Sequence, residues 1–85
     1  MGWVDQAVAP EDFAAAVDQR AATLAKAATF AIAMIKDAVR RGYDLPLDEA
    51  LEIEARNFAR AALSDDAAIG IMSFLAKQEP EYTGR

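Results

Sequence analysis

Apolar residues recur along the chain at steps of three and four, which is the spacing of an amphipathic helix. The first such stripe follows Pro10, a residue suited to the first position of a helix, and acidic residues occupy the next two positions. Its members are Phe13, Val17, Ala21, Leu24 and Ala28. The segment from Val4 to Val8 alternates too briefly to predict more than a loop or a strand stub.

A second stripe consists of Phe30, Met34, Ile35 and Ala38. Two interpretations of its start are open: Thr29 caps a new helix, or the first helix simply continues. Gly42 follows the basic pair Arg40–Arg41, and glycine after basic residues is typical of a helix end.

A third helix is predicted from the region of Pro46, with acidic residues in its first turn. Its stripe consists of Leu47, Leu51, Ala55, Phe58 and Ala62. Ile53 lies off that stripe and indicates a second contact surface. A helix that is apolar on more than one face suits an element packed between other proteins or domains.

The fourth predicted helix is capped by Ser64, with Asp65 and Asp66 directly behind the cap. It is also apolar on two faces, and Pro80 is its expected end. Alanine, the best helix former, is abundant, so the predicted fold is all-α with three to four helices.

The chain has 85 residues, which limits it to one domain of marginal stability. It has neither cysteine nor histidine, so disulfides, thiolate zinc sites, thiol nucleophiles and imidazole bases are excluded. The net charge of −5 argues against nucleic acid or an anionic membrane as a partner. No apolar run approaches the roughly 20 residues that span a bilayer, and the start does not resemble a signal peptide. These features predict a cytoplasmic protein without a metal site.

Carboxylates are the remaining classical catalytic groups, but most of them stand at helix starts, where negative charge is favourable without chemistry. Glu54 falls near an apolar stripe, and an ion pair with Arg56, with Arg60 or with another chain is preferred over a buried base. The aromatics Trp3, Phe58 and Phe74 at helical spacing are most simply core residues.

A second interpretation concerns Lys77, which follows Phe74 by three residues and would share its helical face. An aromatic ring and an ammonium group on one face could stack on a base and pair with a phosphate.

Four motifs in order resemble the C-terminal region of the enoyl-CoA hydratase/isomerase (crotonase) family. The opening Gly2-Trp-Val-Asp-Gln-Ala-Val-Ala-Pro10 is similar to the family's Gly-Leu-Val-Asp/Asn-x-Val-Val-Pro. The segments 36–42 and 47–54 resemble Lys-x-Ala-Leu-x-x-Gly and Leu-Glu-Glu-Ala-Leu-x-Leu-Glu. At the end, the residues in register are Gly70, Phe74, Leu75, Lys77, Pro80, Tyr82, Gly84 and Arg85. Three departures are Ala27-Ala-Thr29, where the family has Asn-Ser-Pro, Ile69, where it has Glu, and Trp3, where it has Leu.

The resemblance implies that residues 1–85 are a single helical segment that builds the trimer interface and covers the active site, without the βα spiral core. It implies no catalytic residue in this chain, because the family's oxyanion hole and acid/base carboxylates lie on that core. It implies that Phe58, Phe74 and Lys77 help enclose the adenine end of coenzyme A.

For the function, the resemblance implies a fragment or split partner of an enzyme of fatty acid metabolism, non-catalytic on its own. Its substrate is an acyl-CoA thioester, bound only together with the core, and no cofactor is held covalently. The expected partner is a second copy or a crotonase-like core chain. The alternative is a stand-alone helical protein–protein interaction module.

Overall fold

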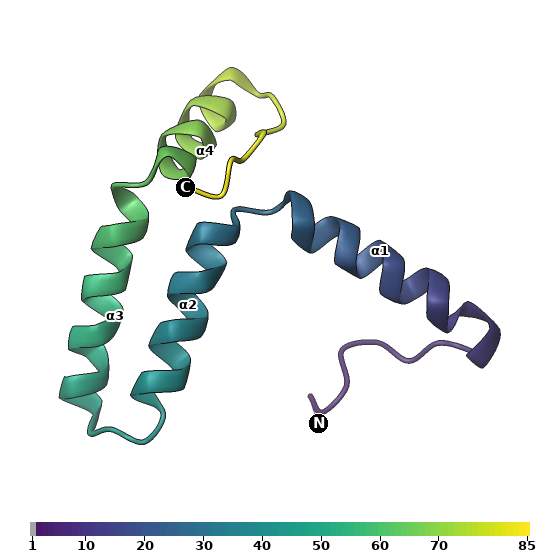
Figure 1. The fold of residues 1–85 in the computed structure, drawn as a ribbon, viewed down its shortest axis with the longest axis horizontal. Coiled ribbons are helices and arrows are strands. Elements are labelled where there is room, and N and C mark those ends of the chain that lie inside the picture. The colour runs from purple at the N-terminus through teal and green to yellow at the C-terminus, as the bar shows by residue number, and fades with distance from the viewer. Residues whose placement is uncertain (1) are drawn as a thin grey trace.

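The computed structural model describes residues 2–85, and these form four α-helices after one short 3-10 helix (Figure 1). The 3-10 helix spans Pro10–Asp12, and α1 (Phe13–Lys26), α2 (Thr29–Gly42), α3 (Leu47–Ala62) and α4 (Asp65–Ala76) follow. The described residues contain no strand, so the predicted all-α fold is confirmed. The extended backbone of Ala27 separates α1 from α2, and Thr29 is the first residue of a new helix.

The helices α2 and α3 form an antiparallel hairpin, and most contacts between elements occur within this pair (Figure 1). Small residues allow the two helices to approach closely near the turn. A Cβ atom added to Gly42 would lie 3.2 Å from the Cβ of Ala50, so a larger residue there would push the two helices apart by a few tenths of an ångström. Gly42 therefore belongs to the packing of the hairpin as well as to the end of α2.

The apolar core of the hairpin is very small. Ile53 on α3 is only 8% exposed, and it is the buried hydrophobic side chain among the described residues. The stripe through Leu47, Leu51 and Phe58 is exposed, so it is Ile53, the residue off the stripe, that makes the contact with α2. This agrees with the prediction that α3 has two apolar faces. Among the described residues, no element covers the face with the larger side chains.

A buried asparagine fixes the register of the hairpin. The Asn57 side-chain amide on α3 donates to the Met34 carbonyl at 3.0 Å and to a carboxylate oxygen of Asp37 at 2.9 Å. Arg41, one turn further along α2, pairs with the same Asp37 oxygen at 3.3 Å. The hydrogen bond from Asn57 lowers the pKa of Asp37, and Arg41 adds to that effect against the opposing effect of burial.

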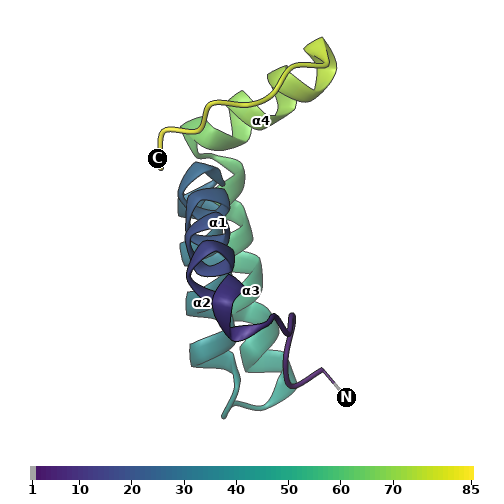
Figure 2. The ribbon, with the colours of Figure 1, turned by 90° about the vertical axis from the view of Figure 1, so that its right-hand side faces the viewer.

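The molecule is open rather than compact, because α1 extends away from the hairpin and meets only its end near α2 (Figure 1). Figure 2 shows α1, α2 and α3 in one thin layer that α4 crosses at one end. The radius of gyration is 16.2 Å, whereas a compact chain of this length has about 12 Å. The accessible surface is 7354 Å², whereas a compact monomer of 9.2 kDa exposes about 4900 Å².

Helix α4 begins as predicted and ends earlier than predicted. The Ser64 hydroxyl accepts a hydrogen bond from the Ala67 amide at 3.1 Å, which confirms the cap. The helix ends at Ala76 because Lys77 adopts the left-handed conformation, with φ of 54°, and Pro80 lies beyond this stop. The amides of Lys77 and Gln78 bond back to the carbonyls of Phe74 and Ser73, the pattern of a Schellman motif.

None of the helices in residues 2–85 combines the length and the apolar character needed to cross a bilayer.

Candidate functional site

Phe58 stands beside a shallow groove between α2 and α3. The ring is 74% exposed, so the interpretation of Phe58 as a core residue is wrong for this chain. The groove has a volume of about 660 Å³, and Glu54 is the one charged side chain in its lining. The rest of the lining is apolar apart from Asn57, and is formed by Ala31, Met34, Ile35, Ala38, Leu51, Ala55, Phe58 and Ala61.

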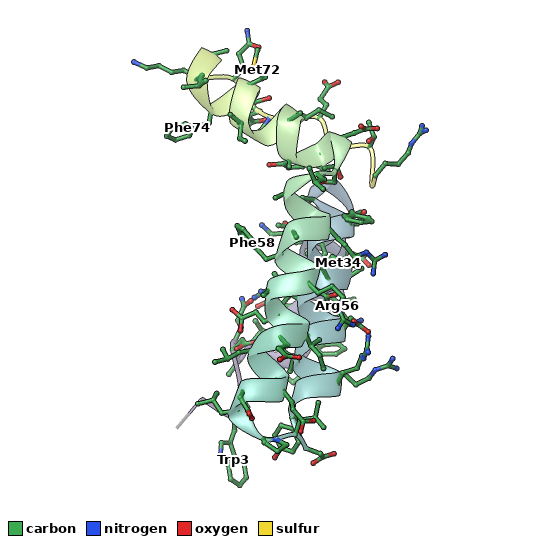
Figure 3. All side chains as sticks on the ribbon, turned by 90° about the vertical axis from the view of Figure 1, so that its left-hand side faces the viewer. Trp3, Met34, Arg56, Phe58, Met72 and Phe74 are labelled. Atoms are coloured by element: carbon green, nitrogen blue, oxygen red, sulfur yellow. The ribbon has the colours of Figure 1, made fainter. Side chains whose placement is uncertain are left out.

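Phe74 projects from α4 and is 82% exposed, and Trp3 is exposed as well, so neither is a core residue here. In Figure 3, the rings of Phe58 and Phe74 project toward the same side of the molecule from two different helices. The groove beside Phe58 is lined by neither Phe74 nor Lys77. Within this chain, the three predicted residues thus offer separate exposed groups rather than one enclosed pocket.

Lys77 does not lie on the helical face of Phe74, because α4 ends one residue before it. The prediction that helical spacing places Lys77 beside Phe74 is therefore wrong. A left-handed backbone costs an ordinary residue about 1–2 kcal/mol, and glycine or asparagine usually takes this position. Lysine in such a conformation is the type of local strain that clusters at ligand-binding sites.

The carboxylates of residues 2–85 do not gather into a metal-binding group. Glu54 is exposed, and the ion pair found in residues 2–85 joins Arg41 to Asp37 rather than Glu54 to Arg56 or Arg60. A pair between Glu54 and another chain stays a prediction. No group of three or more potential metal-binding side chains occurs in the part of the chain that the structure describes.

Asp66 is the residue that the sequence analysis missed. The sequence predicts only a charge at the start of a helix for Asp66, whereas in the structure Asp66 is 3% exposed and accepts hydrogen bonds from Thr83 and Gly84. Asp65 beside it is exposed and fits the simpler interpretation. The two parts of this contact, the acidic start of α4 and residues 83–85, are both visible in the sequence. Helical periodicity does not indicate that they lie together.

Comparison with protein families finds a match over residues 1–85 to the enoyl-CoA hydratase/isomerase family. The chain is 38% identical over 85 residues to a probable enoyl-CoA hydratase of Rhodobacter capsulatus, covering all of this chain and 33% of that protein. It is 36% identical over 85 residues to a 1,2-epoxyphenylacetyl-CoA isomerase of Escherichia coli, covering 99% of this chain and 32% of that protein. The chain thus spans about a third of the length of these curated relatives.

Among solved structures, the fold is similar to that of an enoyl-CoA hydratase from Geobacillus kaustophilus, with a TM-score of 0.82. The two chains are 31% identical, and the match covers 88% of this chain and 28% of the other. The open arrangement of helices is therefore shared with a part of a longer protein.

Proposed function

The chain belongs to the enoyl-CoA hydratase/isomerase family, and we propose that it forms the C-terminal helical part of an acyl-CoA-converting enzyme whose catalytic core is a separate structural unit. In this proposal the chain does not catalyse the reaction. It completes the enzyme by docking onto a crotonase-like core or a second copy, and it contributes to the coenzyme A site. The cytoplasmic location and the role in fatty acid metabolism expected for the family are part of the same proposal.

The observation that carries this proposal is the excess of exposed surface. The chain exposes about 2400 Å² more than a compact monomer of its mass. A standard protein interface covers about 800 Å² on each partner, so this excess is typical of a permanent assembly. The exposed stripes include Phe13, Val17 and Leu24 on α1 and Ile71, Met72 and Leu75 on α4. Apolar patches of this extent mark interaction surfaces.

The coenzyme A contact is proposed for Phe58, Phe74 and Lys77. The two exposed rings could stack on a purine, and the Lys77 ammonium could pair with the ribose phosphate. One support is that these three positions resemble those of the enoyl-CoA hydratase/isomerase family. The other is the left-handed backbone of Lys77, directly after the end of α4. The core supplies the missing walls of the site, because Phe58 and Phe74 stand on different helices with nothing enclosing them.

Complementation tests the main proposal. The Rhodobacter capsulatus relative is truncated by the third that matches this chain, and crotonyl-CoA hydration is measured with and without added chain. We expect neither part to be active alone, and activity to return when both are present. Turnover by the purified chain alone would refute the proposal. A compact monomer that binds neither the core nor a second copy, by analytical ultracentrifugation, would favour the stand-alone interaction module instead.

The coenzyme A contact is tested in the complemented complex by Lys77→Ala, with Lys26→Ala on α1 as the matched control. Removing one charge-assisted phosphate contact should weaken binding of coenzyme A by about tenfold. Binding of coenzyme A without its ribose phosphate should change much less, and Lys26→Ala should change neither. Equal weakening of both ligands by Lys77→Ala would show that Lys77 does not contact that phosphate.

A further inference from the structure

Helix α4 is held to the rest of the molecule more weakly than α2 is held to α3. Only Leu63 and Ser64 connect it to α3, and few contacts join the two helices. After α4 the chain turns back and runs beside the helix toward its start (Figures 1 and 2). Side-chain packing against α3 therefore contributes little to the position of α4.

Asp66 anchors the returning segment to the first turn of α4. Its carboxylate accepts hydrogen bonds from the Thr83 amide at 2.6 Å, the Thr83 hydroxyl at 3.0 Å and the Gly84 amide at 2.9 Å. The Asp66 amide in turn donates to the Arg85 carbonyl at 2.7 Å. Burial opposes ionisation of Asp66, but the hydrogen bonds from Thr83 and Gly84 outweigh it and lower its pKa.

Two glycines bring the same segment against both α4 and α2. A Cβ atom on Gly70 would lie 3.2 Å from the Tyr82 hydroxyl, so the tyrosine ring packs against the bare backbone of α4. Gly84 has a φ of +79°, and a Cβ atom there would lie 3.1 Å from the Thr29 hydroxyl at the start of α2. The segment therefore contacts the first half of α4, at Asp66 and Gly70, and approaches the start of the hairpin at Thr29.

We propose that residues 82–85 form a strap that fixes α4 to the α2–α3 hairpin, and that Asp66 is a positioning residue for the coenzyme A surface. Phe58 belongs to the hairpin and Phe74 to α4, so the strap sets the spacing of the two rings. The role toward coenzyme A rests on the proposed function. The strap itself does not.

The strap is tested by distance measurements between spin labels. The chain has no native cysteine, so Glu52→Cys on α3 and Leu75→Cys on α4 place labels only at these exposed positions. We expect one narrow distance distribution in the parent chain and in the control Asp65→Asn, which removes the same charge one residue away. Asp66→Asn should broaden the distribution while circular dichroism shows the same helix content.

A second variant, Gly84→Ala, keeps Asp66 and should also broaden the distribution, because alanine resists the positive φ and meets Thr29. A broad distribution in the parent chain, or a narrow one in both variants, would overturn the strap.

Binding measurements in the complemented complex separate the strap from its role at the ligand. Asp66→Asn should weaken binding of an acyl-CoA roughly tenfold, about the loss of one charge-assisted contact. It should leave binding of the matching thioester of pantetheine, which lacks the nucleotide, unchanged. If Asp66→Asn broadens the distance distribution but leaves acyl-CoA binding unchanged, the positioning role of Asp66 is refuted and the strap is retained. If Lys77→Ala does not change the affinity for coenzyme A, the proposed contact with the nucleotide is refuted. That result would leave the interpretation of the spin-label distances unchanged.

Discussion

The orientation of α3 leads to a sharp prediction, because two aliphatic residues of one helix face opposite environments. Ile53 is 8% exposed against α2, whereas Leu51 is 51% exposed on the uncovered stripe. Truncating a buried isoleucine to alanine costs about 2–5 kcal/mol, and we expect a loss in this range for Ile53→Ala. Leu51→Ala removes side chain that is half in water and adds a better helix former, so its cost should stay below about 1 kcal/mol.

The assay is urea unfolding of the isolated chain, followed by far-ultraviolet circular dichroism. A hairpin with one buried hydrophobic side chain has little stability to lose. We therefore expect Ile53→Ala to abolish the cooperative transition and Leu51→Ala to preserve it. In the complex with the core, Leu51→Ala should become costly, because a partner then covers the stripe. If Leu51→Ala lowers the free energy of unfolding of the isolated chain as much as Ile53→Ala does, the assigned inner face of α3 is wrong.

Three further outcomes follow from the structure. Lys77→Gly should stabilise α4 by about 1 kcal/mol, seen as slower amide exchange at its last turn, because glycine accepts the left-handed conformation at little cost. The same variant should bind coenzyme A less tightly. The pKa of Asp66 is lowered on folding, so its stabilisation is complete above the ordinary value of 3.8. It should be lost as the pH falls below that value toward the folded pKa, with the strap amides losing protection first. Asn57→Ala should destabilise the hairpin by about 1–3 kcal/mol in the same urea assay, whereas Gln19→Ala on exposed α1 should be nearly neutral.

The helices themselves could be predicted from the sequence because their signals are local. Pro10, Ser64 and the acidic first turns mark helix starts through backbone geometry and hydrogen bonding within a few residues. The start of α2 at Thr29 was undecided, because two alanines continue a helix as readily as they interrupt one. The end of α4 was misplaced because lysine is an uncommon residue for the left-handed position.

The faces of the helices could not be predicted in the same way. An amphipathic pattern shows which face avoids water, but it does not show whether the covering partner belongs to the same chain. In α3 the stripe through Leu51 and Phe58 is exposed, while Ile53 and Asn57 make the contact inside the chain. The role of Asp66 was also hidden, since it depends on a pairing with Thr83 across 17 positions. A contact of this kind produces no periodic pattern of apolar residues in the sequence.

The isolation of α1 has a consequence for the thermodynamics of assembly. A single helix of 14 residues is only marginally stable in water, and α1 packs against little besides its own short leading turn. In the proposed assembly, docking of the Phe13–Leu24 stripe includes the ordering of the helix, and the lost conformational entropy is subtracted from the binding free energy. A large contact area can then coexist with modest affinity and measurable dissociation. The interface formed by α1 should accordingly show a large negative heat-capacity change and an unfavourable entropy.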